Sequence, residues 1–308
     1  MTEPNLSEAP ASSSRDGRVR WYDLITAFIG GNLLGVIGLA VVGLAALLVA
    51  EQHGLKIRSP QDVQVLVRGL LLDFWAIHIS VIVSDLGVLA AIWFVAWRRF
   101  AQPFGFFFPP AGLGTILLAV ASGAGLSILL NGTNELLAHG GWVHITDLPN
   151  ELALVPHGAA QIAGTIAVVA LFAPFVEEYF FRGLFFAWLR QCGTALIGKL
   201  TAAAGARAAR KPMTASPATQ ARMFKAFMWL HKNGAAWFAI LISALVFALV
   251  HGHLFIHPGV QGWLYTFELF LAGVVLALWV VRTGSLRASF ATHAAYNATA
   301  ILMTVLLP

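Results

Sequence analysis

Long apolar runs constrain this chain more than any other feature of its sequence. A helix needs about 20 apolar residues to cross the hydrocarbon of a bilayer. Hydrophobic residues make up 58% of the chain and charged residues only 11%, whereas about a quarter of a soluble domain is charged. Runs of sufficient length cover residues 24–50, 74–97, 111–130, 159–189, 235–250, 262–281 and 288–307. We therefore expect an all-α, polytopic transmembrane helix bundle.

The fourth run decides how many spans the bundle has. It is long enough to be one tilted helix with a continuation, or a span followed by a re-entrant piece, so we expect seven or eight spans. The chain is expected to divide into a disordered cytoplasmic segment 1–20, N-terminal transmembrane helices with outer loops at 21–158, and a transmembrane core at 159–308. A single cysteine, Cys192, excludes an internal disulfide.

Lys and Arg residues are distributed unevenly between the loops. One alternating topology places most of the 19 on the same side of the membrane. These are Arg15, Arg18, Arg20, Arg98, Arg99, Arg190, Lys199, Arg207, Arg210, Lys211, Arg222, Lys225, Lys232, Arg282 and Arg287. Positive charge favours the cytoplasmic side, so we expect a cytoplasmic N-terminus and an outer C-terminus. The net charge of +5 is then explained by orientation and contact with lipid, without nucleic acid as a partner.

The basic loop 191–234 is the longest segment on the cytoplasmic side. Its Ala, Lys and Arg content, with Lys211-Pro212 and Ser216-Pro217 as helix breakers, predicts a partly helical hairpin with a basic face on the membrane. A solvated connector is the simpler alternative. We recognise no targeting segment before the first span, which favours a bacterial inner membrane as the location.

The fourth run contains charged residues, and placing a charged side chain in hydrocarbon has a high free-energy cost. Glu178 and Arg182 are four positions apart and share a helical face, so an ion pair lowers the cost of both. Glu177 is rotated by about 100° from Glu178 and need not join that pair. A carboxylate without an ion partner in an apolar site suits a general base. The pattern suggests Glu177 for chemistry and Glu178 with Arg182 for structural support. The alternative is a buried charge cluster that only ties helices together.

Polar residues occur in two further runs. His251 ends the fifth run and shares a helical face with Phe247. His293 and Asn297 share a face of the last run and together could bind a water, a metal or an oxyanion. Measured from the basic ends of their helices, these residues lie at overlapping depths. We therefore expect a shared intramembrane polar cavity that opens toward the cytoplasm.

Three motifs in this order resemble the CPBP family of intramembrane proteases, which includes CAAX proteases and bacteriocin-processing enzymes and is also called the Abi family. The motifs are Glu-Glu-x-x-x-Arg at 177–182, Phe-x-x-x-His at 247–251 and His-x-x-x-Asn at 293–297. Thr283-Gly284-Ser285-Leu286 resembles a further element of the family. The resemblance covers about 166–300. One departure is Ala277, which stands where the family often has the second Gly of a Gly-x-x-x-Gly pair.

The resemblance implies an intramembrane endopeptidase with a conical cavity open to the cytoplasmic face. It implies that Glu177 and His251 position and activate a water, and that His293 and Asn297 stabilise the oxyanion. The partners would be a peptide or membrane-protein substrate and the lipid bilayer. Prenylated carboxyl-terminal peptides fit some relatives, but no residue in this sequence identifies a prenyl group as a ligand.

The catalytic type and the activity have alternatives. Glu177, His251 and His293 could bind zinc with an open fourth position, although the sequence lacks the His-Glu-x-x-His signature of many zinc proteases. A metal-free glutamate mechanism is slightly favoured. The protein could instead be a proteolytically inert partner, such as an immunity protein, or a transporter.

Two acidic residues in other spans bear on the transporter alternative. Asp85 and Glu268 could extend a polar path through Glu177 and Glu178. A transporter should also show broken helices in two matching halves, and the sequence shows no such pair. We expect Asp85 to hydrogen-bond with a neighbouring helix. Glu268 is expected to do the same or to border the cavity.

Overall fold

A computed structural model describes residues 17–52, 59, 61–64, 73–143, 155–210, 216–257 and 259–306. Every long regular element in these ranges is a helix, which confirms the predicted all-α fold. The predicted disordered segment 1–20 lies outside them except for its last four residues.

Within the described ranges, six helices are long and apolar enough to cross a membrane. They cover Trp21–Val49, Phe74–Arg99, Leu113–His139, Ala159–Arg207, Ala218–Ile256 and Gly259–Thr283. Each coincides with one predicted run. The seventh run forms helix α14 (Leu286–Leu306), whose hydropathy is lowered by polar residues such as His293 and Asn297. The protein is thus a polytopic bundle with six candidate spans and α14 packed among them.

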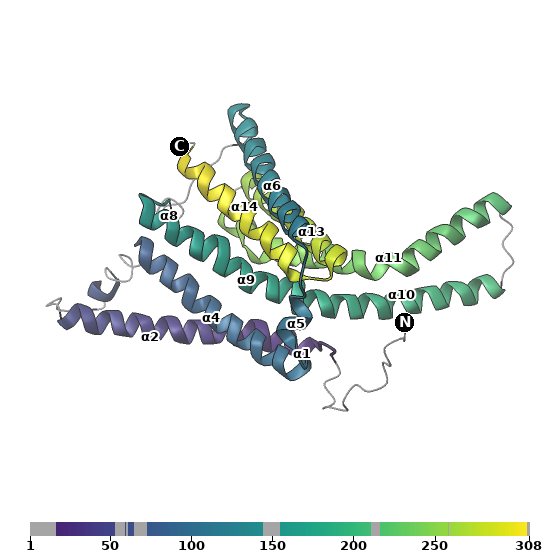
Figure 1. Ribbon diagram of the computed structural model, residues 1–308, viewed down its shortest axis with the longest axis horizontal. Helices are drawn as coiled ribbons and strands as arrows, with labels where there is room; N and C mark the ends of the chain where they lie inside the picture. Colours follow the sequence, from purple (N-terminus) through teal and green to yellow (C-terminus); the bar gives the residue numbers. More distant parts are fainter. Residues whose placement is uncertain are drawn as a thin grey trace, which may run out of the picture.

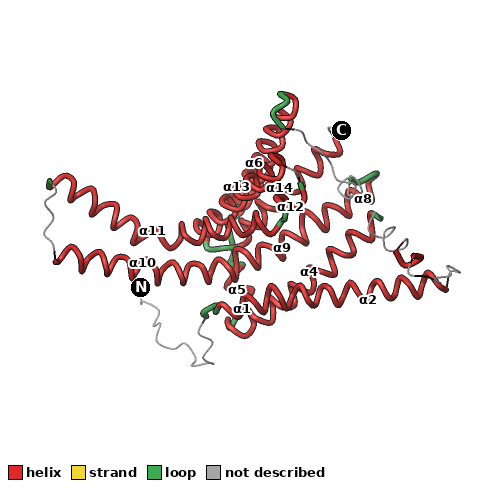
Figure 2. The backbone as a smooth tube through the Cα atoms, turned by 180° about the vertical axis from the view of Figure 1, so that it is seen from behind, coloured by secondary structure: helices red, strands yellow, loops and turns green. Residues whose placement is uncertain are grey.

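The helices pack in an order that differs from their order in the chain (Figures 1 and 2). Helix α4 (Phe74–Arg99) lies between α2 (Gly31–Gln52) and α9 (Ala173–Glu178). On the other side of α9 lie α14 and α6 (Leu113–His139), followed by α13 (Gly259–Thr283). Helix α9 is therefore enclosed on both sides, and its polar residues face other helices.

Glycines allow the first two spans to approach closely. A Cβ at Gly31 would lie 2.6 Å from the Cα of Val88, and one at Gly87 would lie 2.5 Å from the backbone nitrogen of Gly35. Such distances are too short for any side chain. Gly31 and Gly35 form a small-xxx-small pair, which in membranes lets helix backbones touch. The glycines therefore fix α2 against α4.

The helix that contains the two glutamates runs without a break from Ala159 to Arg210 and includes two π-helical segments. These are η2 (Ile166–Phe172), which precedes Pro174, and η3 (Tyr179–Phe185), which follows Glu178. A proline clashes with the carbonyl one turn earlier in a regular α-helix, and a wider turn relieves this clash. The chain thus continues through Pro174, and the acidic pair lies between two widened turns.

The basic loop forms a long helical hairpin. Helix α10 (Phe186–Arg210) extends out of the bundle and packs against the middle of α11 (Pro217–Val250). Ser216 caps α11 by accepting a hydrogen bond from the backbone N–H of Thr219. The predicted hairpin is confirmed, and it is more helical than expected. Its contact with a membrane stays a prediction.

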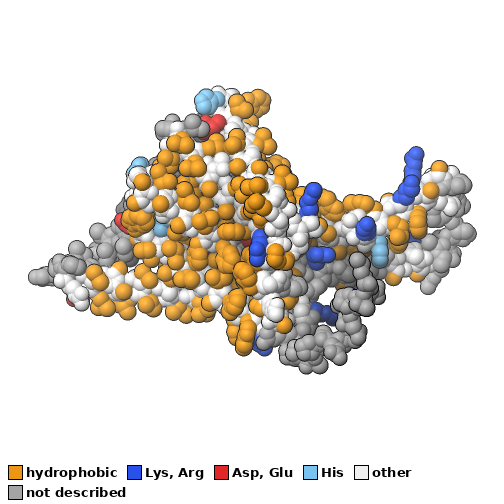
Figure 3. Space-filling model, viewed as in Figure 1, with side chains coloured by type: hydrophobic (Ala, Val, Ile, Leu, Met, Phe, Trp, Pro, Cys, Tyr) orange, Lys and Arg blue, Asp and Glu red, His pale blue; other side chains and the backbone are white. Residues whose placement is uncertain are grey.

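Basic side chains gather toward the end of the molecule from which α10 and α11 extend, here called the hairpin end (Figure 3). Apolar side chains cover the body. At this end Arg99, the last residue of α4, pairs with Asp23, with 2.8 Å between Nε and Oδ2. Helix ends from separate spans thus bring their cations to one side, as the positive-inside pattern requires. Which side of the membrane this end faces stays a prediction.

We expect Gly123→Ala to lower the stability of the bundle. Its Cβ would lie 2.0 Å from the backbone oxygen of Thr292, so α6 and α14 would have to move apart. Overpacking of this kind costs about 1–3 kcal/mol. Gly125→Ala is the matched control, because nothing lies within 4 Å of its Cβ, and replacing a helical glycine normally stabilises. Unfolding in detergent micelles should show opposite signs for the two variants; equal shifts would contradict the packing.

Candidate active site

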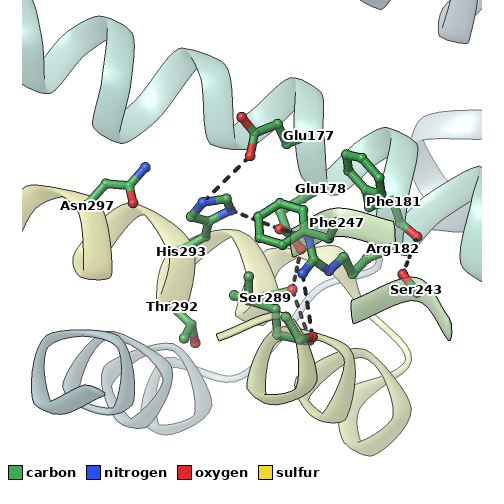
Figure 4. A network of polar contacts seen from close by, with 12 residues as sticks. Glu177, Glu178, Phe181, Arg182, Ser243, Phe247, Ser289, Thr292, His293 and Asn297 are labelled. Atoms are coloured by element: carbon green, nitrogen blue, oxygen red, sulfur yellow. Dashed lines mark hydrogen bonds and ion pairs between the residues drawn. The ribbon is translucent and has the colours of Figure 1, made fainter. Parts of the chain in front are cut away.

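Four of the predicted site residues line one cavity of about 320 Å³ between the helices. They are Glu177 from α9, His251 at the end of α11, and His293 and Asn297 from α14. Most of the remaining wall is apolar, and most of it comes from α13 and α14. Figure 4 shows Glu177 and Asn297 on either side of His293. Side chains that are more than 100 positions apart in the chain therefore meet in one hollow.

Glu178 and Arg182 form the predicted ion pair. Arg182 Nη1 donates to Glu178 Oε1 across 3.0 Å, and both side chains are fully buried. Ser289 Oγ donates to the other carboxylate oxygen, Oε2. Buried charges need both a partner and hydrogen bonds to offset desolvation. Glu178 is therefore held within the protein, while Glu177 keeps 29% of its side chain exposed at the cavity.

The packing around Arg182 depends on two further residues. Its guanidinium lies over the ring of Phe247, 4.1 Å from the ring centroid, which is a close cation–π contact. A Cβ at Gly273 would lie 2.9 Å from the Cα of Ala244 and 3.3 Å from Arg182 Nη2. Gly273 thus lets α13 approach α11 and leaves room for the guanidinium. Ala277, one turn later, is fully buried, so alanine packs where the family often has glycine.

His293 links the two glutamates. Its Nδ1 lies 2.9 Å from Glu178 Oε1, and its Nε2 lies 3.7 Å from Glu177 Oε2. A carboxylate oxygen accepts, so Nδ1 is the nitrogen that donates to Glu178. This bond fixes the orientation of the ring, as a partner on one imidazole nitrogen generally does. Nε2 is thereby directed at Glu177 and the cavity.

Asn297 is anchored to the helix that contains the glutamates. Its Nδ2 donates to the backbone oxygen of Val169 across 2.8 Å. Val169 lies in η2, where the widened turn changes the backbone hydrogen-bonding pattern. Since an amide nitrogen has two hydrogens, Asn297 keeps a second N–H that can donate at the cavity.

His251 is positioned by the end of its helix. The φ of Gly252 is +76°, a left-handed conformation that glycine adopts readily and that terminates α11 after His251. His251 Nδ1 lies 2.7 Å from the backbone oxygen of Phe247. A carbonyl can only accept, so Nδ1 donates and Nε2 of the neutral ring is an acceptor.

The turn before α14 sets the position of His293 and Asn297. Gly284 has a φ of +68° and reverses the chain between α13 and α14. Ser285 Oγ accepts from the backbone N–H of Arg287 and donates to the carbonyl of Pro109. Thr283-Gly284-Ser285-Leu286 therefore caps α14 and attaches its start to the segment before α6.

The structure gives no support to the predicted zinc ligands as a set. Among the described residues, no group of three or more His, Cys, Asp or Glu side chains is arranged to hold a metal ion. We assign no metal-dependent step to Glu177, His251 and His293.

Some residues of the site were missed at the sequence level. Ser289 contacts Glu178, and Thr292 Oγ1 donates to the carbonyl of Ala119 on α6, which ties α14 to its neighbour. Ser289, His293 and Asn297 are spaced four apart, so the helical face that predicted the last two also contains the first.

Asp85 and Glu268, the two acidic residues in other spans, differ in their hydrogen bonds. Glu268 Oε2 accepts from Asn134 Nδ2 on α6 across 3.1 Å, as expected for a contact with a neighbouring helix. The expected hydrogen bond of Asp85 is wrong, because its buried Oδ2 has no hydrogen-bond partner within the described ranges. Asp85 instead borders a second cavity, which Glu177 and His251 also line.

The fold and the cavity together define a class of protein. It is a multi-pass helical membrane protein with a carboxylate, two imidazoles and an amide enclosed between its spans. This combination is typical of hydrolytic sites that exclude bulk water.

Residues 159–299 match the model of one family, described as "Type II CAAX prenyl endopeptidase Rce1-like". Over this region the chain is similar to that family, which confirms the predicted resemblance to the CPBP proteases. The matched stretch is a little under half of the chain and contains every residue of the candidate site. No curated protein and no solved structure matched the chain.

Proposed function

We propose that this protein is an intramembrane endopeptidase that hydrolyses a peptide bond with a water activated by Glu177 and His251. One observation carries the proposal: Glu177, His251, His293 and Asn297 line a single cavity within the bundle. The family match supports the same class of activity. Since the basic hairpin end should face the cytoplasm, cleavage is proposed near that side of the membrane. A bacterial inner membrane stays the predicted location.

Glu177 is the proposed general base. The water donates one hydrogen bond to the Glu177 carboxylate and the other to His251 Nε2, which is free to accept because Nδ1 donates to Phe247. Glu177 takes the proton as the water oxygen attacks the carbonyl carbon of the peptide. It then returns that proton to the leaving amide nitrogen as the C–N bond breaks. The products are a carboxylic acid, which keeps the second proton of the water until it ionises in solution, and an amine.

His293 and Asn297 are the proposed oxyanion donors. The tetrahedral intermediate places negative charge on the former carbonyl oxygen, and fixed donors in a dry cavity stabilise such charge strongly. With both nitrogens protonated, His293 donates to Glu178 from Nδ1 and to the oxyanion from Nε2. The second N–H of Asn297 adds another donor. The buried Glu178–Arg182 pair keeps His293 in place.

A membrane-embedded or membrane-attached peptide is the proposed substrate class. Because the cavity wall is mostly apolar and lies between spans, it suits a peptide with apolar side chains. The name of the matched family refers to prenylated CAAX peptides, so prenylated and unprenylated forms of one peptide should be compared.

Purified protein should cleave members of a peptide library, and the rate should be unchanged by a metal chelator. We expect this because the described residues contain no group of three or more His, Cys, Asp or Glu side chains placed to hold a metal ion. Mass spectrometry of the products, with and without chelator, is the measurement. Loss of cleavage with chelator alone, restored by added zinc, would show that the metal-free proposal is wrong.

The same assay separates the alternatives. A proteolytically inert partner would give no product with any peptide and would keep its cellular phenotype in a Glu177→Ala variant. A transporter would likewise leave the library intact and would move a solute across reconstituted liposomes.

A further inference from the structure

A second cavity, of about 330 Å³, lies on another side of Glu177 and His251. It is bounded by α2, α4 and α9, and its polar wall contains Asn32, Ser84 and Asp85. Glu177 and His251 line this cavity as well as the first one. The two proposed water-activating residues therefore stand between two hollows of different character.

We propose that the second cavity is a water-binding site that feeds the reaction, and that Asp85 positions the hydrolytic water against Glu177 and His251. The inference rests on the proposed function and deepens it. A peptide seated in the first cavity would block water from that side. The second cavity leaves Glu177 and His251 accessible to water while the peptide is bound.

The polar lining of the second cavity fits water. Buried water typically makes two to four hydrogen bonds, and each molecule takes about 30 Å³ in the liquid. The cavity has room for several molecules, and Asn32, Ser84, Asp85 and Glu177 offer donors and acceptors. Asp85 Oδ2 is buried and has no hydrogen-bond partner within the described part of the chain. A bound water would supply that partner and relieve the cost of the unpaired oxygen.

The close packing of α2 and α4 places these groups. Gly35 lies directly against Ser84, because a Cβ at Gly35 would be 3.0 Å from the Cα of Ser84. Asn32 Nδ2 donates to the carbonyl of Phe28 across 2.6 Å, which fixes its amide at the cavity. The first two spans, which lie outside the matched family region, thus contribute one wall of the proposed active site.

The first test measures water in the cavity and needs no activity. Cys192, the only cysteine, is replaced by serine, and Ser84→Cys is introduced in protein reconstituted into liposomes. A charged methanethiosulfonate should label Ser84→Cys, because a thiol reacts only where water ionises it. Leu86→Cys is the control, since Leu86 lies on the same helix and is 50% exposed on the apolar outer surface. Labelling of Ser84→Cys no faster than Leu86→Cys would overturn the water site.

The second test separates positioning from folding. Asp85→Asn should lower kcat about tenfold to a hundredfold, since misplacing a reacting group by an ångström has effects of that size. KM should stay close to the wild-type value, because Asp85 does not line the peptide cavity. Glu268→Gln is the matched control, an acid-to-amide change in another span outside both cavities, and should leave both constants unchanged. An Asp85→Asn enzyme with normal kcat would overturn the role of Asp85.

The labelling test can fail independently of the proposed function, whereas the kinetic test requires an active wild type. If the wild type cleaves no peptide, the protease proposal fails, whereas labelling of Ser84→Cys still reports on water in the cavity. If the wild type is active and Ser84→Cys stays unlabelled, only the water route is wrong.

Discussion

Replacing Glu177 with glutamine should reduce peptide cleavage by about 10²–10⁴-fold, the usual contribution of a positioned general base. Glutamine keeps the size of the side chain but cannot accept a proton from water. Folding should survive, because the nearest charged contact of Glu177 is His293 Nε2 at 3.7 Å, longer than a hydrogen bond. The measurement is kcat on a cleaved library peptide, together with the unfolding midpoint in the same detergent.

Glu135→Gln is the matched control for this change. Glu135 lies in α6 with its side chain 71% exposed, far from any buried contact. Its replacement should leave kcat unchanged. Cleavage by folded Glu177→Gln at the wild-type rate would remove the proposed base from the mechanism.

Arg182→Met should produce the largest loss of stability. The substitution leaves the Glu178 carboxylate buried without its cation, and breaking a buried pair in this way costs about 3–5 kcal/mol. It also removes the cation–π contact with Phe247. The free energy of unfolding in mixed micelles is the measurement. Loss of His293 alignment should lower activity even in molecules that stay folded.

The control for Arg182→Met is Arg190→Met on the same helix. Arg190 is exposed at the hairpin base, so its loss should change stability little. Arg182 would have no structural role if Arg182→Met and Arg190→Met unfolded at the same denaturant concentration.

Much of the fold could be predicted from hydropathy alone. A span must satisfy its backbone hydrogen bonds internally, so a long apolar run has few alternatives to a helix. Each candidate span accordingly coincides with one predicted run. Polar residues expose the limit of this reasoning. Helix α14 lies in the bundle, yet polar residues such as His293 and Asn297 make it less apolar than the six candidate spans.

The division between the two glutamates was also accessible from sequence. Helical spacing pairs Glu178 with Arg182 and turns Glu177 away, and the geometry agrees. The same spacing predicts which residues share a face but not which helices are neighbours. The hydrogen bond from Asn297 to Val169 therefore could not be anticipated. It depends on a widened turn before Pro174, which the proline signals only as a local disturbance.

The second cavity could not be predicted from the sequence. Asp85 is an isolated acidic residue in an apolar run, for which a hydrogen bond to a neighbouring helix is the simplest expectation. Glycine contacts between α2 and α4 instead place Asp85 beside Glu177 and His251 at a hollow. The position of a side chain relative to a void depends on three helices at once, and local patterns contain no such information.

Cleavage in water enriched in ¹⁸O tests the central claim most directly, namely that the cavity bounded by Glu177, His251, His293 and Asn297 hydrolyses peptides. Protein in liposomes should release a fragment whose new carboxylate contains one heavy oxygen, and Glu177→Gln should release almost none. The absence of any fragment from the wild type, or a fragment without heavy oxygen, would contradict the claim.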